Sequence, residues 1–329
     1  MKHNLKLIGI IIAMFIITQL IGLYVINHYS PTQVINNVQQ NVSAPNSLPF
    51  NLEPPPETGQ ANILQTLLYI IPSFVIAILI FFILTKFKAE FVLKAWFFIV
   101  VIIALATSLI SFLPSSTLFL VIALVVAVPL AFFKIYKRNF LIHNITELFI
   151  YPGIAAVFVA LLSTAGNPNR GVYVMIVLLI LISIYDLWAV WHSGIMQKMA
   201  RYQIDKLKIF AGFLIPEISK QVKMQMQKMK NLKKKNKNKK TKGIKINIAL
   251  LGGGDIVWPL ITAGVVLRRF GFTNVLGLQF PVASLLVVLG ATLGLTGLLL
   301  FGKRKRPYPA MPFISIGVFI ALALCYLLL

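Results

Sequence analysis

Long apolar stretches without charges dominate the chain and predict its secondary structure. Nine can be distinguished, each close to the roughly 20 residues that a helix needs to cross a bilayer. They cover residues 6–26, 62–85, 91–113, 115–133, 144–165, 172–192, 247–267, 281–301 and 309–329. None shows the period-two alternation of a membrane β-barrel strand. The pattern therefore predicts an all-α membrane protein with nine transmembrane helices.

The first stretch has two interpretations. Lys2 and Lys6 precede the apolar core, as basic residues do in a signal peptide. The core from Leu7 to Ile26 is longer than a typical signal-peptide core, and no clear small-x-small cleavage site follows closely. We therefore expect a retained transmembrane helix.

Composition agrees with a membrane protein. Hydrophobic residues make up 58% of the 329 residues and charged residues only 12%, against about 25% charged in soluble domains. The formal net charge of +23 would suggest nucleic acid in a soluble protein, but a mean hydropathy of +0.87 argues against that interpretation. The single cysteine, Cys325, excludes an intramolecular disulfide and a cysteine-based zinc site.

The basic residues predict the orientation in the membrane. With the N-terminus in the cytoplasm, 28 of the 31 Lys and Arg residues fall on the cytoplasmic side. Only Arg170, Arg268 and Arg269 fall outside. Because basic loops stay in the cytoplasm, we expect a cytoplasmic N-terminus and, after nine spans, an extracytoplasmic C-terminus.

Two soluble segments interrupt the apolar pattern. Residues 28–60 lack Lys and Arg and are expected to form an extended external loop. Residues 193–245 form a basic cytoplasmic loop, in which 195–210 has the pattern of an interfacial amphipathic helix. Its Lys-rich end, 220–245, fits binding to anionic lipid or nucleic acid, or a solvated linker that enforces topology; we favour the linker.

This loop divides the chain into three predicted parts. Residues 1–192 form a six-helix part, 193–245 the loop, and 246–329 a three-helix part.

The few acidic residues carry the information about chemistry. Of eight, only Asp186 and Asp255 lie well inside predicted spans, where a carboxylate costs at least about 2.5–3.5 kcal/mol. Glu147 is expected in the first turn of its span, where a helix N-terminus favours a carboxylate. His143 and His192 are expected at the cytoplasmic interface, too far from other ligand types to predict a metal site.

Asp186 and Asp255 are predicted to face each other. They lie roughly 9 and 12 Å below the same surface, on consecutive spans of opposite direction. Two close carboxylates in a low dielectric share one proton, so that one acts as base toward water and the other as acid toward a carbonyl oxygen. That is aspartic peptide hydrolysis. An ion or proton relay, or two separately satisfied carboxylates, fits the depth equally well.

The neighbours of the aspartates favour the protease. Gly252, Gly253 and Gly254 precede Asp255 and permit close approach of another chain. A phosphate-binding loop is disfavoured, because no strand is predicted before the glycines and no Lys-Ser/Thr pair follows them. The last span opens with prolines, so its start is unlikely to be regular helix; its first residues are Pro309, Ala310, Met311 and Pro312.

These motifs resemble those of presenilins, signal peptide peptidases and their archaeal homologues. Tyr185 with Asp186 is similar to the family's Tyr-Asp motif, and residues 252–255 to its Gly-x-Gly-Asp motif. The third motif, Pro-Ala-Leu, is matched by Pro309, Ala310 and Met311. Motif identity is confined to these three places, although the topology is similar over most of the chain.

The resemblance implies an intramembrane aspartic endopeptidase without metal or organic cofactor. Asp186 and Asp255 are its implied catalytic pair. It acts on single-pass helices or remnant signal peptides. The short chain suits an archaeal homologue, and hence the plasma membrane of a prokaryote.

The resemblance also implies that other residues of the motifs shape the site and hold an unwound substrate: Tyr185, Gly252, Gly253, Gly254, Pro309, Ala310 and Met311. Two of them depart from the family pattern. Met311 replaces Leu, and Gly253 replaces a larger residue at a position associated with substrate choice. The basic loop lacks a long apolar stretch like the one presenilins cleave in themselves, so we expect no obligatory self-cleavage.

Two other function classes stay open at the level of sequence. A channel or ion-coupled transporter would use the same two carboxylates. A prepilin-peptidase-like enzyme also uses a Gly-x-Gly-Asp aspartate, but it lacks the proline-rich final span.

Overall fold

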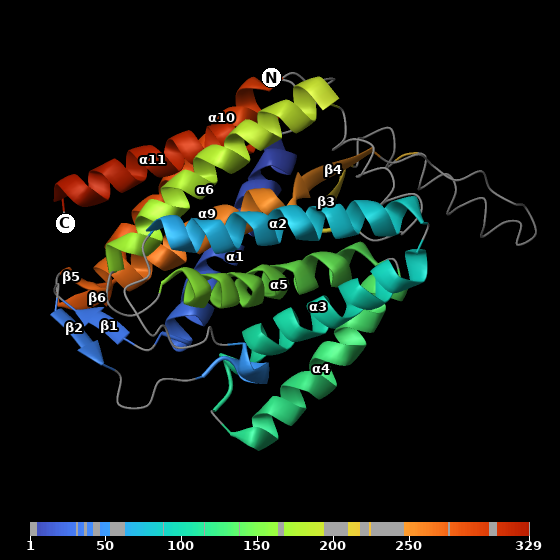
Figure 1. Cartoon of the computed structure of the whole chain (residues 1–329), viewed down its shortest axis with the longest axis horizontal. Coiled ribbons are helices and arrows are strands. Elements are labelled where there is room, and N and C mark those ends of the chain that lie inside the picture. Colours follow the sequence, from blue (N-terminus) through green and yellow to red (C-terminus); the bar gives the residue numbers. More distant parts are fainter. Residues whose placement is uncertain are drawn as a thin grey trace, which may run out of the picture.

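The chain folds as a bundle of long helices (Figure 1). The computed structural model describes residues 5–30, 32–35, 38–41, 47–52, 63–87, 89–114, 116–137, 139–163, 168–193, 210–217, 224, 247–275, 277–302 and 308–328. Within these ranges it has nine α-helices of 18 residues or more and three two-stranded antiparallel sheets.

The helices follow the nine predicted stretches. They are α1 (Leu5–His28), α2 (Ile63–Lys86), α3 (Glu90–Ile110), α4 (Thr117–Tyr136), α5 (Phe140–Leu162), α6 (Pro168–Trp188), α9 (Gly253–Phe270), α10 (Val282–Phe301) and α11 (Met311–Leu328). The strands are β1 (Thr32–Ile35), β2 (Val38–Asn41), β3 (Gly212–Glu217), β4 (Asn247–Gly252), β5 (Thr273–Val275) and β6 (Leu278–Phe280). A 3-10 turn covers Pro49–Asn51, and a π-helical turn, η2 (Ala189–Ser193), continues α6.

The helical membrane class is confirmed. Among the described residues, eight helices are long and apolar enough to cross a membrane. The remaining long helix, α9, has three charged residues, Asp255 near its start and Arg268 and Arg269 at its end. It is not exposed to lipid along its length, because 12 of its 18 residues are buried.

The predicted seventh span is wrong at its start. Residues 247–252 were expected to be helical, but they form β4, which pairs with β3. Helix α9 begins only at Gly253. A six-residue apolar run does not distinguish helix from strand by its own pattern, and here the pairing partner decides. That partner, β3, lies within the stretch predicted to be a cytoplasmic loop.

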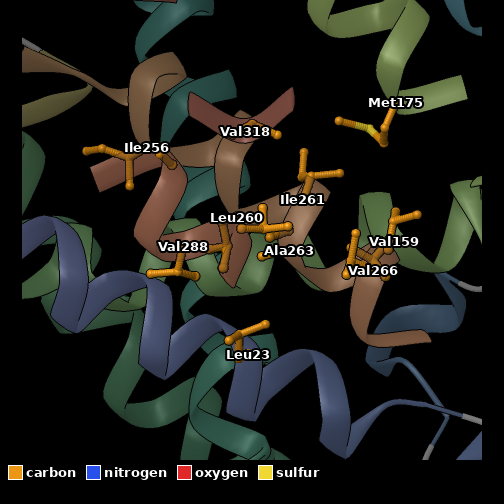
Figure 2. Packing of buried hydrophobic residues seen from close by; sticks show 14 of the residues in the cluster. Leu23, Val159, Met175, Ile256, Leu260, Ile261, Ala263, Val266, Val288 and Val318 are labelled. Atoms are coloured by element: carbon orange, nitrogen blue, oxygen red, sulfur yellow. The ribbon is translucent and has the colours of Figure 1, made fainter. Parts of the chain in front are cut away.

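Helix α9 is at the centre of the main apolar core. Its neighbours are α1, α5, α6 and α10, with α11 next to α6 and α10. Figure 2 shows Ile256, Leu260, Ile261 and Val266 packed among side chains of surrounding helices, Leu23 of α1 included. A helix that is apolar on all sides is typical of a buried position, so the central helix places Asp255 inside the bundle.

Helices α3 and α4 lie on one side of this core, below α5 in the view, and α2 is seen between α5 and α6 (Figure 1). α3 and α4 pack on each other and on α5 around a second cluster that includes Leu105, Ala127 and Ile150. α2 contacts α3 and α6 and leaves most of its apolar side chains exposed. In a membrane these side chains face lipid.

The outer ends of α1 and α5 meet the end of α9. The guanidinium of Arg268 donates to the carbonyls of Ser163 (3.3 Å) and Tyr29 (3.2 Å), which end α5 and follow α1. A cation there satisfies free carbonyls and complements the helix dipoles. Arg268, expected to be a simple external flank, therefore ties three helices together.

Candidate active site

Asp186 lies in the last turn of α6, just before the chain changes to the π-helical turn η2. Its side chain is buried, with 7% of the residue exposed. The predicted helix to residue 192 therefore divides here into an α part and a π part. Single π turns are frequent at functional sites, and this one follows directly after the carboxylate.

The start of α11 holds the Asp186 carboxylate. The backbone N–H of Met311 donates to Asp186 Oδ2 at 3.1 Å, and the backbone of Ala310 donates as well. The first N–H groups of a helix have no partner within it and carry partial positive charge. Because Pro309 and Pro312 have no N–H, the free donors of this segment are those of the two residues between them.

A second hydrogen bond joins the same two helices. Ser183 Oγ, one turn before Asp186, donates to Ser315 Oγ on α11 at 2.9 Å. Ser315 is buried, with 2% exposed. This hydrogen bond fixes α11 against α6 one helical turn away from Asp186.

Asp255 lies in the first turn of α9, directly after β4. Its carboxylate accepts a hydrogen bond from the backbone N–H of Gly252, the N-cap residue. This is the reciprocal half of a capping box, in which the third helical residue reaches back to the cap. The backbone of the strand-to-helix turn thus holds the Asp255 carboxylate in place.

The three glycines before Asp255 differ in their surroundings. A Cβ on Gly252 would lie 3.1 Å from Asp255 Oδ2, and one on Gly253 would lie 2.9 Å from Tyr151 Oη. A Cβ on Gly254 would meet only Trp258, at 3.9 Å, and Gly254 is exposed. The closest approach is at Gly253, and there the neighbour is Tyr151 of α5 in the same chain.

The two aspartates lie on α6 and α9, which pack together. The carboxylate of Asp255 interacts electrostatically with that of Asp186. Asp186 is buried and Asp255 is half-buried. Tyr185, beside Asp186, is 46% exposed, and its ring lies 6.4 Å from that of Trp188. The two side chains, 69 residues apart in the sequence, therefore lie on packed helices and are near enough for their carboxylates to interact.

A β-hairpin leads into Asp255. β3 and β4 pair antiparallel, with Gly212 opposite Gly252 and Leu214 opposite Leu250. The N–H of Gly253 donates to the carbonyl of Ala211 at 3.2 Å, which extends the ladder by one residue. A strand therefore does precede the glycines, contrary to the expectation from the sequence. No Lys-Ser/Thr pair follows them.

Side chains of α5 occupy the outer edge of β3. Asn144 accepts from the Leu214 N–H at 3.0 Å and donates to the Leu214 carbonyl at 2.8 Å. His143 Nε2 lies 2.8 Å from the Gly212 carbonyl, and Glu147 Oε1 accepts from the Gly212 N–H at 3.4 Å. These contacts fill the backbone positions that a third strand would use.

Glu147 is also paired with Lys134 of α4, and both side chains are buried. The sequence placed Glu147 in the first helical turn near the surface, which is wrong, because α5 begins at Phe140. His143, expected at the interface, is likewise buried. The spacing of 143, 147 and 151 along one helix face was the available signal, but their partner strand is not visible in the sequence.

No group of three His, Cys, Asp or Glu side chains suited to a metal ion occurs in the described ranges.

Fold and site together define a class: a multi-pass helical membrane protein with two interacting aspartates on neighbouring helices. Comparison with protein families agrees. The model of the family described as signal-peptide peptidase, presenilin aspartyl protease matches residues 50–328. The chain belongs to that family. As a member it is an integral membrane aspartic endopeptidase that cleaves transmembrane substrates, and the channel or transporter alternative is not favoured.

Solved structures share the fold. One, described as a presenilin family intramembrane aspartate protease in space group C222, matches with a TM-score of 0.57 and 17% identity, covering 98% of this chain and 99% of that one. A structure with the same description in space group P2 matches with a TM-score of 0.56 and 15% identity, covering 97% of each chain. A search of curated proteins found no match.

Proposed function

We propose that Asp186 and Asp255 are the catalytic pair of this protease. One observation supports the proposal: the two intramembrane carboxylates interact electrostatically, and Asp186 is held by the start of α11 while Asp255 is held by the N-cap of α9. Close carboxylates share a proton. One then takes a proton from water while the other protonates the carbonyl oxygen of the scissile peptide bond. Neither step requires a metal or an organic cofactor.

The free edge of β4 is the proposed binding place for an unwound substrate. The hydrogen bond from Gly253 to Ala211 shows that the residue pairs 211/253 and 213/251 are the hydrogen-bonded pairs of the β3–β4 ladder. Because hydrogen-bonded and non-hydrogen-bonded pairs alternate in an antiparallel ladder, Leu250 and Ile248 direct their backbone N–H and C=O groups away from β3. No hydrogen bond to those groups is found among the described residues. An extended peptide that adds there becomes a third strand.

The opposite edge of the hairpin does not accept a strand. Asn144, His143 and Glu147 occupy the outward groups of Leu214 and Gly212. The next outward residue, Pro216, has no N–H to donate. A substrate therefore adds on the β4 side, directly before Asp255, where the scissile bond reaches the aspartates.

Residues beside the aspartates shape this site. Gly254 faces open space next to Asp255, and Tyr185 is exposed next to Asp186. Pro309, Ala310 and Met311 supply the turn that aims two N–H groups at Asp186. Gly252 and Gly253 leave room for the carboxylate and for Tyr151. The Met for Leu exchange at 311 leaves the hydrogen bond intact, because the donor belongs to the backbone.

The proposed topology has nine transmembrane helices, a cytoplasmic N-terminus and an extracytoplasmic C-terminus. Helix α9 is included although it is less apolar, because residues 256–267 carry no charge and other helices surround it. The basic loop within 193–245 joins the six-helix and three-helix parts on the cytoplasmic side. The expected setting is the plasma membrane of a prokaryote, and the expected substrates are single-pass helices or remnant signal peptides.

The test is cleavage of a transmembrane peptide by the purified protein in detergent or liposomes. Asp186→Asn and Asp255→Asn are each expected to lower kcat by about 10³-fold or more. Glu90→Gln, which neutralises a carboxylate at the start of α3, is the control and is expected to keep full activity. Full activity in either Asn variant refutes the pair. An intact single-chain mass in the active preparation supports action without self-cleavage.

A further inference from the structure

Tyr151 lies where α5, β3 and the start of α9 meet. It follows Glu147 by one helical turn on the face of α5 that also carries His143. The residue is buried, with 3% exposed, and its ring packs edge-to-face on Phe213 of β3 with centroids 6.0 Å apart. Phe213 itself is fully buried. The ring is therefore fixed from the side of the hairpin.

On its other side the ring faces Gly253. A Cβ at that position would lie 2.9 Å from Tyr151 Oη, 3.0 Å from Cε1 and 3.3 Å from Cζ. Such contacts are shorter than normal van der Waals separations, and the buried ring has little room to withdraw. Tyr151 thus occupies the volume that a side chain at position 253 would take.

The hydroxyl of Tyr151 is buried and has no hydrogen bond of ordinary geometry in the described part of the chain. It lies within hydrogen-bonding reach of the Glu147 carboxylate and also interacts electrostatically with the Asp255 carboxylate. A buried hydroxyl without a well-formed hydrogen bond costs about 1–3 kcal/mol, so the position of this one between two carboxylates calls for an explanation. Its place beside Asp255 supplies one.

We propose that Tyr151 is a positioning residue for Asp255, and that the missing side chain at Gly253 is what admits it. This rests on the proposed function, because it assigns Tyr151 to the aspartate pair. The ring supports the strand-to-helix turn that carries Asp255. The hydroxyl presents a dipole to the Asp255 carboxylate and lies within reach of the Glu147 carboxylate as well.

Tyr151→Phe removes only the hydroxyl. We expect kcat to fall about tenfold, the equivalent of about 1.4 kcal/mol, with KM and the melting temperature unchanged. Tyr29→Phe is the matched control, since it removes another buried hydroxyl, one that donates to the Thr107 carbonyl at 2.7 Å. It is expected to lower the melting temperature and leave kcat unchanged. Unchanged kcat in Tyr151→Phe, or an equal fall in the control, overturns the role of the hydroxyl.

A double-mutant cycle tests the shared space. Gly253→Ala in the wild-type background is expected to lower kcat/KM about tenfold, and the same change in Tyr151→Leu to lower it less than twofold further. Equal penalties in both backgrounds overturn the pairing of Tyr151 with Gly253. Both tests compare variants with an active wild type that needs both aspartates. If that requirement fails, the proposed function is refuted, and if only the Tyr151 results fail, the function stands without this positioning role.

Discussion

Each glycine before Asp255 is required, or tolerated, for a different structural reason. Gly252 caps α9, and a Cβ there would press on the Asp255 carboxylate that the Gly252 N–H binds. Gly254 is exposed and faces open space. Each of the three glycines therefore has its own role: Gly252 caps α9, Gly253 makes room for Tyr151, and Gly254 is open to the proposed substrate.

This difference gives a prediction at the residue scale. Gly252→Ala is expected to lower kcat at least about tenfold, because the carboxylate must move from its place. Gly254→Ala is the matched comparison. It is expected to raise stability by up to about 1 kcal/mol through helix propensity, with kcat within about twofold and any loss confined to KM. Steady-state kinetics and thermal unfolding of both variants check this, and the reverse ranking of kcat contradicts it.

At the scale of elements, α5 holds the hairpin in place. Three of its side chains bind the outer edge of β3, and β3 in turn fixes β4, which leads into Asp255. An isolated two-stranded hairpin is marginally stable. The polar face of α5 therefore determines whether β4 presents an ordered edge to a substrate.

Asn144 provides the test of this element. Asn144→Ala removes both hydrogen bonds to Leu214 and leaves its backbone groups unsatisfied, at about 1–3 kcal/mol each. KM is expected to rise at least about fivefold, more than kcat falls, because strand addition needs the ordered edge.

The matched control is Asn139→Ala at the N-cap of α5, where the side chain accepts from Leu141 at 2.9 Å. Its loss is expected to cost about 1 kcal/mol of stability without a change in KM. Peptide-cleavage kinetics and melting curves of the two variants distinguish the outcomes. A KM for Asn144→Ala equal to that of the wild type contradicts the proposal that Asn144 keeps the β3–β4 hairpin ordered for substrate binding.

At the scale of the whole molecule, the arrangement explains how charge is tolerated in the interior. Helix α9, with its charged ends, is enclosed by α1, α5, α6 and α10, while the nearly bare apolar surface of α2 faces outward. Charged groups in a membrane protein are least costly where protein, not lipid, surrounds them. Asp255 and Arg268 occupy such positions at opposite ends of one helix.

The proposed topology is tested by labelling with a thiol reagent that does not cross membranes. The only cysteine, Cys325, is buried, so Cys325→Ala supplies the background. Asn274→Cys, at an exposed position of β5, is expected to react in intact cells. Lys230→Cys, in the basic loop, is expected to react only after the membrane is opened. The opposite pattern shows an inverted orientation.

The sequence alone determined the helical membrane class, the candidate aspartates and the proline-rich start of the last helix. These depend on local properties: the length of apolar runs, the rarity of charge within them, and the missing N–H of proline. The matched depth of Asp186 and Asp255 followed from the same counting. The location of Pro309 and Pro312 also predicted where backbone groups lack helical partners, although not that they would face Asp186.

Only the tertiary structure decided that residues 247–252 are a strand, that α5 clamps β3, and that Gly253 makes room for Tyr151. Each depends on a partner far along the chain: Asn144 and Leu214 are 70 residues apart, and Glu147 and Gly212 are 65 apart. A short apolar run fits helix or strand equally well until another strand pairs with it. The roles of the buried His143 and Glu147 could likewise not be predicted, because the backbone groups that they bind belong to Gly212, far along the chain.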